Sequence, residues 1–436
     1  MSADKLLLVY LLPLLLIWAA WIGIGKLRSR RDRAILEDNI QAGLMEPNTL
    51  HPVIDPALCL GCAACARACP EKTIIGIIDG KAALIEPSMC VGHGACAQAC
   101  PTKAITLVFG SETRGVDIPI LSPSFETSVP GIFIAGELGG MGLIKNAIEQ
   151  GRQAIVHAAT RSRSISGEPD VLDVVIVGCG PAGIAASLGA IEQKLKFVTL
   201  DQSSLGGTVS HFPRGKLVMT APATLPLVGK VKFGEVSKEK LLAFWQGVLK
   251  DTGLKPNFEE HVAAVHRHGE LFEVVTSRRS YRTRTVLLAI GRRGSPRTLD
   301  VPGEELDKVV YRLIDPEQYA GKKVLVVGGG DSALEAAVRI ADQPGTQVTI
   351  SYRSAAYSRA RSRNREAIQQ AVEQGRVTQL LGSHVEQIDQ QSVILRHGGQ
   401  SRRIDNDYVI ICAGGILPTQ FLHDMGVTVE TKFGKV

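Results

Sequence analysis

Two similar stretches organise the chain: CLGCAACARACP at residues 59–70 and CVGHGACAQACP at residues 90–101. In the first stretch, two, two and three residues separate four successive cysteines, and a proline follows the fourth. Thiolates at this spacing hold iron–sulfur clusters, and the fourth cysteine of each run normally ligates the cluster of the other run. The pattern therefore predicts a small α+β domain with two clusters over residues 51–108.

Exchange of the fourth cysteines defines two ligand sets. The first is a complete set of four thiolates, suited to a 4Fe-4S cluster: Cys59, Cys62, Cys65 and Cys100. The second has three thiolates: Cys69, Cys90 and Cys96. His93 stands where the second run would have its other cysteine, and an imidazole that replaces thiolate on cluster iron raises the potential. Either His93 completes a second 4Fe-4S site, or that cluster is of the 3Fe-4S type and His93 only lies nearby. The two runs resemble those of two-cluster bacterial ferredoxins.

Disulfides and zinc are the other common uses of so many cysteines. Seven of the nine cysteines lie in this stretch, and only Cys179 and Cys412 lie elsewhere. Nucleotide-binding motifs farther along the chain indicate a reducing cytosol, which disfavours a disulfide framework. Zinc would need one set of four ligands, whereas the chain has two interleaved runs that each end in Cys-Pro.

The N-terminal segment is almost wholly apolar from residue 6 to residue 25, with Trp18 and Trp21 toward one end. About 20 such residues span a bilayer as a helix. A basic cluster follows: Lys26, Arg28, Arg30, Arg31 and Arg33. This order predicts a transmembrane anchor at 1–25 and a basic juxtamembrane linker at 26–50, with the N-terminus outside the plasma membrane and the catalytic part in the cytoplasm. A cleaved signal peptide would instead carry its charges before the apolar run.

Composition restricts the remaining possibilities. The chain has 436 residues, which is too long for a single core, and its 45 glycines suit an α/β protein that binds nucleotides through tight turns. Its net charge of +6 is small and local, so nucleic-acid binding is not expected.

A dinucleotide-binding fingerprint lies at LDVVIVGCGPAGIAAS, residues 172–187. An apolar run rich in β-branched residues precedes Gly178, Gly180 and Gly183, and a run of small residues typical of a helix follows. Asp201 ends the next expected strand, where a carboxylate can bind a ribose. Together these features predict a pyrophosphate site at the N-terminus of a helix.

A second fingerprint lies at KKVLVVGGGDSALEAA, residues 322–337. Its turn residues are Gly328, Gly330 and Ala333. Ser351 occupies the position of the ribose-binding carboxylate and Arg353 follows, which favours the 2′-phosphate of NADP(H) over NAD(H). Further arginines come next, and they could equally be a solvated helix face: Arg359, Arg361, Arg363 and Arg365.

Residues 172–422 resemble the thioredoxin-reductase-like flavoproteins, and most closely the bacillithiol disulfide reductase branch. Besides the two fingerprints, the matching motifs are LGGT at 205–208, VPGE at 301–304 and VIICAGGILPTQ at 409–420. The resemblance implies two Rossmann-like, three-layer domains. FAD would bind at 172–302 and NADP(H) at 303–422, with a tail at 423–436 that returns to the FAD domain.

The resemblance also implies that Gly206 and Gly207 contact FAD. The redox Cys-x-x-Cys of thioredoxin reductases is missing, because VVYRLIDPEQYAGKK at residues 309–323 contains no cysteine. Cys179 is then the only thiol within the flavin fingerprint. It is either a lone redox thiol or simply the small residue that the tight turn requires.

The family's last FAD motif is absent from the C-terminus, but FETSVPGIFIAGELGG begins at residue 125. We therefore expect a circular permutation in which 109–160 is the displaced end of the FAD domain, joined through a linker at 161–171. Gly136 and Glu137 of this segment would then contact the flavin. An unrelated strand–helix unit is the alternative.

The permutation makes a structural prediction, because chain rearrangements of this kind require neighbouring ends at the surface. Val436 should lie close to residues 111–118.

The expected function is membrane-anchored electron transfer between NADPH, FAD and the two clusters, to or from a redox protein or a quinone. No side chain is predicted to act as a base or nucleophile, since the flavin performs the chemistry. The alternatives are a disulfide reductase that uses Cys179, a ferredoxin–NADP reductase that forms NADPH, and a non-catalytic assembly subunit. A homodimer is a further expectation.

Overall fold

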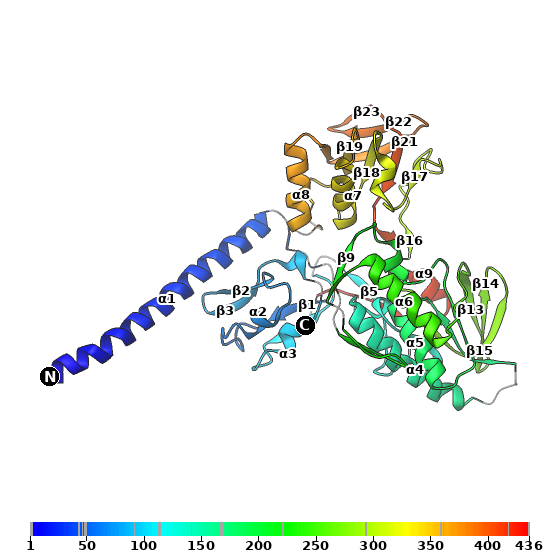
Figure 1. The fold of residues 1–436 in the computed structure, drawn as a ribbon, viewed down its shortest axis with the longest axis horizontal. Coiled ribbons are helices and arrows are strands. Elements are labelled where there is room, and N and C mark those ends of the chain that lie inside the picture. The colour runs from blue at the N-terminus through cyan, green and yellow to red at the C-terminus, as the bar shows by residue number, and fades with distance from the viewer. Residues whose placement is uncertain are drawn as a thin grey trace. The chain divides into compact units, whose positions relative to one another are not determined.

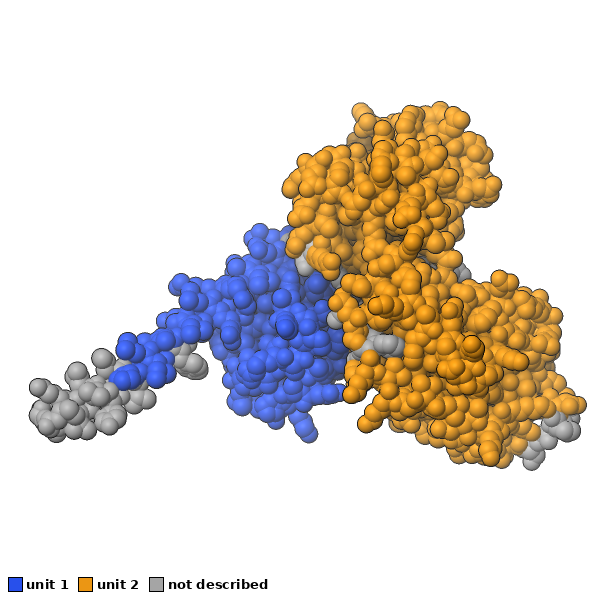
Figure 2. Space-filling view, viewed as in Figure 1, with its two compact units in different colours: residues 1–115, 433–436 blue, residues 116–432 orange. Residues whose placement is uncertain are grey.

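The computed structural model divides into two units, residues 1–115 with 433–436, and residues 116–432 (Figure 2). It describes the chain except for residues 1, 2, 42, 43, 46, 48, 49, 91, 112–114, 141, 166–169, 220, 221, 233, 293, 358, 359, 361, 417, 435 and 436. Within its helices and strands, the side chains of residues 3–12, 14, 21, 219, 295 and 362 also lie outside the description.

The cluster-binding runs belong to a small α+β fold in the first unit (Figure 1). Two antiparallel strand pairs form it: β1 (His51–Ile54) with β4 (Ile105–Val108), and β2 (Ile75–Ile78) with β3 (Lys81–Leu84). Two short helices follow the first cysteines of each run: α2 (Ala64–Ala68) and α3 (Ala95–Gln98). Cysteines supply much of the core, because Cys59, Cys65 and Cys96 are buried among the apolar side chains of the strands.

Helix α1 (Ala3–Gln41) packs its C-terminal part on β2 and extends beyond the fold that carries the clusters (Figure 1). The expected linker at 26–50 is therefore helical as far as Gln41. Its polar side chains dock it: Asp32 accepts a hydrogen bond from the Ile77 N–H at 2.9 Å, and Asn39 donates to the Ile85 carbonyl at 3.0 Å. Both Asp32 and Asn39 are buried.

The predicted transmembrane helix is not found. Among the residues that the structure describes, no helix combines the length and the apolar character needed to cross a bilayer. Most of the apolar run from residue 6 to residue 14 has side chains outside the description.

The FAD-binding part is built on a sheet whose parallel strands run in the order β8–β7–β15–β6. These strands are β6 (Ile132–Ile134), β7 (Leu172–Val177), β8 (Phe197–Leu200) and β15 (Ser280–Leu288). Apolar residues occupy successive positions in β7, as expected for a strand buried on both faces. The antiparallel strands β13 (Val262–His268) and β14 (Leu271–Thr276) extend the sheet beyond the first half of β15.

Helices and small hairpins complete this part. The helices are α4 (Ile144–Arg163), α5 (Pro181–Glu192) and α6 (Lys238–Thr252), with the short 3-10 turns η2 (Glu137–Gly139) and η3 (Gly207–His211). The hairpin strands are β9 (Leu217–Met219), β10 (Ala223–Leu225), β11 (Gly229–Val231) and β12 (Glu235–Ser237). Gly151 of α4 lies so close to α5 that an added Cβ would be 2.1 Å from the Ala182 carbonyl oxygen.

The second nucleotide fold has a parallel sheet in the order β17–β24–β18–β19–β20. Its strands are β17 (Val309–Val310), β18 (Lys323–Val327), β19 (Gln347–Tyr352), β20 (Val377–Leu381) and β24 (Tyr408–Ile411). Helices α7 (Asp331–Ala341) and α8 (Ser362–Glu373) pack together on one face of this sheet. An antiparallel sheet packs on the other face: β21 (Ser383–Ile388), β22 (Ser392–His397) and β23 (Gln400–Asp405). The short pair β16 (Ser295–Pro296) and β25 (Gly415–Ile416) links the outgoing and returning chain.

The circular permutation is confirmed. Strand β6 of the displaced segment lies parallel to β15 in the FAD sheet. At the other end of the chain, α9 (Thr419–Asp424) leads to β26 (Val429–Lys432), which pairs with β5 (Val116–Pro119). Lys432 is opposite Val116, and the Gly434 N–H donates to the Phe109 carbonyl at 2.8 Å. Val436 and residues 112–114 themselves lie outside the described residues.

Candidate functional site

Four cysteines from both runs line one cavity in the first unit: Cys59, Cys62, Cys65 and Cys100. The Gly61 and Ala82 N–H groups each donate to the Cys59 Sγ at 3.4 Å, and the Ala104 N–H donates to the Cys100 Sγ at 3.3 Å. A hydrogen bond from Thr102 lowers the pKa of the Cys100 thiol. These donors stabilise negative charge on sulfur, as a cluster with thiolate ligands requires.

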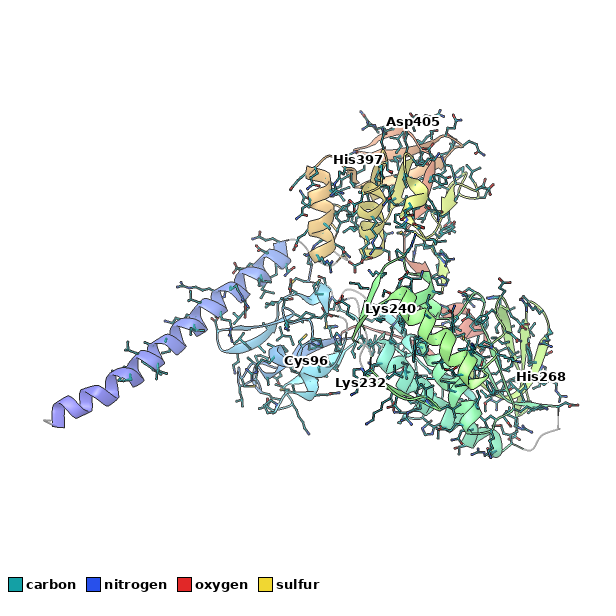
Figure 3. All side chains as sticks on the ribbon, in the orientation of Figure 1. Cys96, Lys232, Lys240, His268, His397 and Asp405 are labelled. Atoms are coloured by element: carbon teal, nitrogen blue, oxygen red, sulfur yellow. The ribbon has the colours of Figure 1, made fainter. Side chains whose placement is uncertain are left out.

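A second cavity collects the other predicted ligands: Cys69, Cys90, His93 and Cys96. The structure thus brings the imidazole into the same cavity as the three thiolates. Burial raises the pKa of the Cys90 thiol to about 11 and also raises that of Cys96. Thiolates buried in this way need a positively charged partner, which the iron of a cluster supplies. Figure 3 marks Cys96 on α3 in this domain.

The ligand loops depend on left-handed backbone conformations. Gly61 has φ +67°, and a Cβ there would lie 1.9 Å from the Gly80 carbonyl oxygen. Ala63 has φ 58° directly before α2. Only a chain without a Cβ at position 61 can bring the Cys59–Cys62 loop against the β2–β3 hairpin. All nine cysteines are free thiols, and no three His, Cys, Asp or Glu side chains in the described ranges are placed to hold a single metal ion.

The first nucleotide fingerprint forms a tight turn between β7 and α5. Gly178 has φ +106°, and a Cβ there would lie 2.4 Å from the Ala289 carbonyl oxygen. A Cβ on Gly183 would lie 1.8 Å from the Gly178 carbonyl oxygen. Gly180 precedes α5 as its N-cap, so the turn leads directly to the positive end of the helix dipole. The turn has the form that a pyrophosphate needs.

The LGGT loop lies against this turn. The Gly206 N–H donates to the Cys179 carbonyl at 3.0 Å, and a Cβ on Gly207 would lie 3.1 Å from the Gly180 Cα. The two glycine-rich segments therefore face each other closely, as expected for residues that contact one cofactor.

Asp201 follows β8 and faces the glycine-rich turn. One carboxylate oxygen accepts from the Cys179 N–H at 2.7 Å, and the other accepts from the Ser203 N–H at 2.8 Å. Asp201 is buried, so its first role in this structure is to hold the turn. Each carboxylate oxygen has a second lone pair, and the predicted contact to a ribose hydroxyl therefore stays a prediction.

Gly136 and Glu137 join this site from the displaced segment. The Gly136 N–H donates to the Gln150 Oε1 at 2.8 Å, and a Cβ on Gly136 would lie 3.1 Å from the Ala182 Cβ at the start of α5. The side chain of Glu137 is exposed. Desolvation by the surrounding protein nevertheless raises the pKa of its carboxyl, and the charge of Arg292 opposes the rise.

Arg292 was missed by the sequence analysis. It follows β15 in the sequence AIGRR, and its guanidinium donates to the Asp117 carbonyl at 3.0 Å. Its proximity to Glu137 could not be inferred, because the permutation separates the two residues by most of the FAD domain. The only local signal was a basic pair directly after a buried strand.

Cys179 is fully buried in the glycine-rich turn. Burial, together with the nearby charge of Asp201, raises the pKa of its thiol to about 12. A thiol that is protonated at neutral pH and closed to solvent is a poor nucleophile. Its complete burial agrees with the expectation of a small residue that packs inside the turn.

The second fingerprint repeats the first. A Cβ on Gly328 would lie 2.4 Å from the Cys412 carbonyl oxygen, whereas one on Gly330 would meet nothing within 4 Å. Gly330 is the N-cap of α7, so its open side is available to a phosphate. Ala333 is buried at the start of the helix. The hydroxyl of Ser351 is hydrogen-bonded to Ser383 at 2.7 Å.

The arginines predicted to bind the 2′-phosphate are only partly described. Arg353 is exposed directly after β19, where it can reach a ribose phosphate. Arg363 is exposed and Arg365 is half-buried in α8. Arg359 and Arg361 lie outside the described residues. The choice of NADP(H) therefore continues to rest on Arg353 and on the missing carboxylate at position 351.

A polar network links the two nucleotide folds, and it too was missed. Lys216, directly before β9, forms an ion pair with Glu335 of α7. Asn364 of α8 donates to Asp331 at 2.7 Å and to Glu335 at 3.1 Å. The acidic residues belong to the turn sequence GGGDSALE, and no local pattern indicates a partner that lies 119 residues away.

Residues 175–435 match the family of pyridine nucleotide-disulphide oxidoreductases, and residues 51–101 match the 4Fe-4S dicluster domain. The chain therefore belongs to the pyridine nucleotide-disulphide oxidoreductases. It is an NAD(P)H-dependent flavoprotein oxidoreductase with an iron–sulfur domain. Residues 116–163 precede the matched region although they complete its fold, as the permutation requires.

Its relatives include reductases with different names. A bacilliredoxin reductase of Bacillus subtilis is 26% identical over 268 residues, which are 60% of this chain and 82% of that protein. A ferredoxin–NADP reductase of Ignicoccus hospitalis is 31% identical over 182 residues, which are 42% of this chain and 56% of that one. The solved bacillithiol disulfide reductase of Staphylococcus aureus shares the fold, with a TM-score of 0.53, 23% identity and coverage of 60% and 84%.

Proposed function

We propose that this protein passes electrons between NADPH, FAD and two iron–sulfur clusters, and between the clusters and a redox protein or quinone. One observation carries the proposal. Two cavities lined by cysteines suited to bind clusters belong to the same chain as a pyridine nucleotide reductase. In the fingerprint expected to bind the flavin, the one thiol is that of Cys179, which is buried and protonated at neutral pH. The clusters then take the place of the missing dithiol as the route for electrons.

The chain's own residues bind and orient the two nucleotides. Bound FAD supplies the capacity to exchange two electrons with a nicotinamide and single electrons with a cluster. Gly178, Gly180 and Gly183 bring backbone N–H groups and a helix N-terminus to the pyrophosphate. Glu137 and Arg292 present opposite charges at the flavin side of the site. Arg353 offers a guanidinium to the 2′-phosphate of NADPH.

Anaerobic rapid mixing with NADPH tests the proposal. We expect the visible flavin absorbance to bleach and cluster EPR signals to appear afterwards. Arg353→Ala should weaken the preference for NADPH over NADH about tenfold or more, because a charge-assisted contact to phosphate is lost. Arg363→Ala in α8 is the matched control. A protein that neither bleaches nor develops an EPR signal would be a non-catalytic subunit.

A disulfide reductase is the second candidate, since the matched family is that of pyridine nucleotide-disulphide oxidoreductases and one relative is named a bacilliredoxin reductase. It would have to use Cys179, whose burial and raised pKa oppose such a role. Cys179→Ser should leave the rate of flavin bleaching by NADPH within about twofold, because the substitution alters no charge at neutral pH. Loss of turnover with a disulfide substrate in this variant, with bleaching retained, would support the disulfide reductase instead.

Formation of NADPH is the third candidate, and it is suggested by the relatives named ferredoxin–NADP reductase. The direction depends on the cluster potentials, which span more than a volt among iron–sulfur proteins. A redox titration followed by EPR decides it. Clusters with potentials well below that of the NADP couple favour NADPH formation, and clusters above it favour NADPH oxidation.

We also propose that the N-terminal apolar segment attaches the protein to the inner membrane, with the reductase in the cytoplasm. The support is the apolar run followed by basic residues, and the exposure of Leu16, Ile17 and Trp18 on α1. The full chain should sediment with membranes after a carbonate wash, whereas a chain that starts at residue 26 should not. Recovery of both in the soluble fraction would contradict the proposal.

A further inference from the structure

The β2–β3 hairpin brings a positive charge to the backbone of Cys59, a predicted ligand of the first cluster. Its tip is Asp79-Gly80-Lys81, and the Gly80 carbonyl lies against Gly61 of the ligand loop. The Lys81 Nζ donates to the Cys59 carbonyl at 2.7 Å, and the next N–H in the strand, that of Ala82, donates to the Cys59 Sγ at 3.4 Å. Adjacent residues of β3 thus hold both the backbone and the sulfur of one cluster ligand.

The same hairpin tip carries a negative charge that α1 holds. Arg33 of α1 forms an ion pair with the Asp79 carboxylate. Ser29, one helical turn earlier, donates to Asp79 Oδ1 at 3.4 Å, and its hydroxyl oxygen accepts from the Asp79 N–H at 3.1 Å. The Asp79 carboxylate is therefore bound by side chains of α1. Lys81 instead contacts the ligand loop through the Cys59 carbonyl.

We propose that Lys81 is a positioning residue for the cluster held by Cys59, Cys62, Cys65 and Cys100, and that its charge raises the reduction potential of that cluster. Arg33 and Ser29 of α1 bind the Asp79 carboxylate, so Asp79 does not neutralise the charge of Lys81. The inference rests on the proposed cluster site and adds to it the group that adjusts its potential.

The physical reason is electrostatic. Reduction adds one negative charge to the cluster and its thiolates, and a fixed ammonium group nearby stabilises the reduced form more than the oxidised form. The hydrogen bond to the Cys59 carbonyl restrains a side chain that would otherwise move freely in solvent. The Arg33–Asp79 pair is exposed, so its contribution should be smaller and should decrease as salt is added.

The test is an EPR redox titration of the full protein that reports each cluster separately. Lys81→Gln keeps a hydrogen-bond donor but removes the charge, and should shift the first midpoint to a more negative potential. Lys81→Arg keeps the charge and should restore it. Arg33→Gln should give a smaller negative shift at low salt, and Asp79→Asn a positive one. The midpoint of the second cluster should not change.

A control separates the possible failures. Arg28→Gln removes an exposed charge from the same helix and should not shift the first midpoint. An unchanged midpoint in Lys81→Gln, or equal shifts in both clusters, overturns the inference. If Lys81→Gln loses iron, Arg33→Gln and Asp79→Asn decide, because these side chains pair with each other and not with a predicted cluster ligand. If the unmodified protein shows no cluster signal, the proposed function itself fails.

Discussion

At the scale of single residues, the two cluster sites differ in a way that spacing alone could only suggest. Local sequence places three cysteines of the first run on one loop, and Cys90 and Cys96 of the second run on another, because two-residue spacers allow thiolates to converge. The exchange of Cys69 and Cys100 between the runs and the entry of His93 into the second cavity depend on how the two loops pack. Whether His93 binds iron stays a prediction.

His93→Cys tests that ligand directly. An additional thiolate should give an all-cysteine site and shift the midpoint of the second cluster to a more negative potential, because thiolate donates more charge than imidazole. If the native cluster has three irons, the substitution should convert it to four, which iron analysis and EPR both detect. An EPR spectrum identical to that of the unmodified protein would count against both forms of the hypothesis.

At the scale of elements, α4 shows how the displaced segment belongs to the FAD fold. Its glycine at position 151 allows the helix to approach the start of α5 closely, and its neighbours Ala154, Ile155 and Ala158 are buried in the same core as β7. The helical pattern was visible in the sequence. Its partner was not, because the contact joins segments on either side of the expected linker.

Gly151→Ala should destabilise the FAD domain by about 1–3 kcal/mol, because the new methyl group would overlap the Ala182 carbonyl. Thermal unfolding followed by flavin release measures the change. Gly247→Ala in α6 is the matched control, since a Cβ there meets nothing within 4 Å and should stabilise the helix by about 0.5–1 kcal/mol. Equal stability of the two variants would argue against close α4–α5 packing.

The C-terminal half of α1 is a further case at this scale. Sequence reasoning assigned residues 26–50 to a linker because of their charge, but a buried aspartate fastens the helix to β2. Asp32→Ala leaves the Ile77 N–H without its acceptor and should cost about 1–3 kcal/mol.

Hydrogen exchange at Ile77 measures this loss of docking, and limited proteolysis of α1 gives a second readout. Asp32→Asn, which keeps an acceptor, should retain most of the protection. Asp38→Ala, at an exposed position of the same helix, should behave like the unmodified protein. Unchanged protection in Asp32→Ala would show that the helix docks through other contacts.

At the scale of the whole molecule, the permutation places the iron–sulfur domain directly before the displaced FAD segment in the chain. The β5–β26 pair marks the place where the related, unpermuted chain would continue, since Lys432 is opposite Val116. A chain that runs from 172 to 432, through a two-residue Asn-Gly turn, and on through 116–163 should therefore fold and bind FAD. Such a turn suits an antiparallel pair in this register.

The flavin content of that rearranged chain, measured by absorbance after gel filtration, decides the matter. The control is a chain of residues 172–432 alone, which lacks β6 and α4 and should bind little FAD because Glu137 and one strand of the sheet are missing. Equal flavin content in the two chains would mean that the displaced segment contributes nothing to the site.

The sequence by itself was enough to predict the cluster ligands, and it determined both nucleotide turns and the presence of a displaced FAD segment. Each of these is encoded in a short run, where spacing and glycine conformation leave few alternatives. Only the tertiary structure decided that Cys179 is buried from solvent and that residues 26–41 dock as a helix. It also decided that Arg292 lies near Glu137, Lys216 pairs with Glu335 and Lys81 contacts Cys59. Those contacts join residues far apart in the chain, and their free energy depends on packing that no local pattern records.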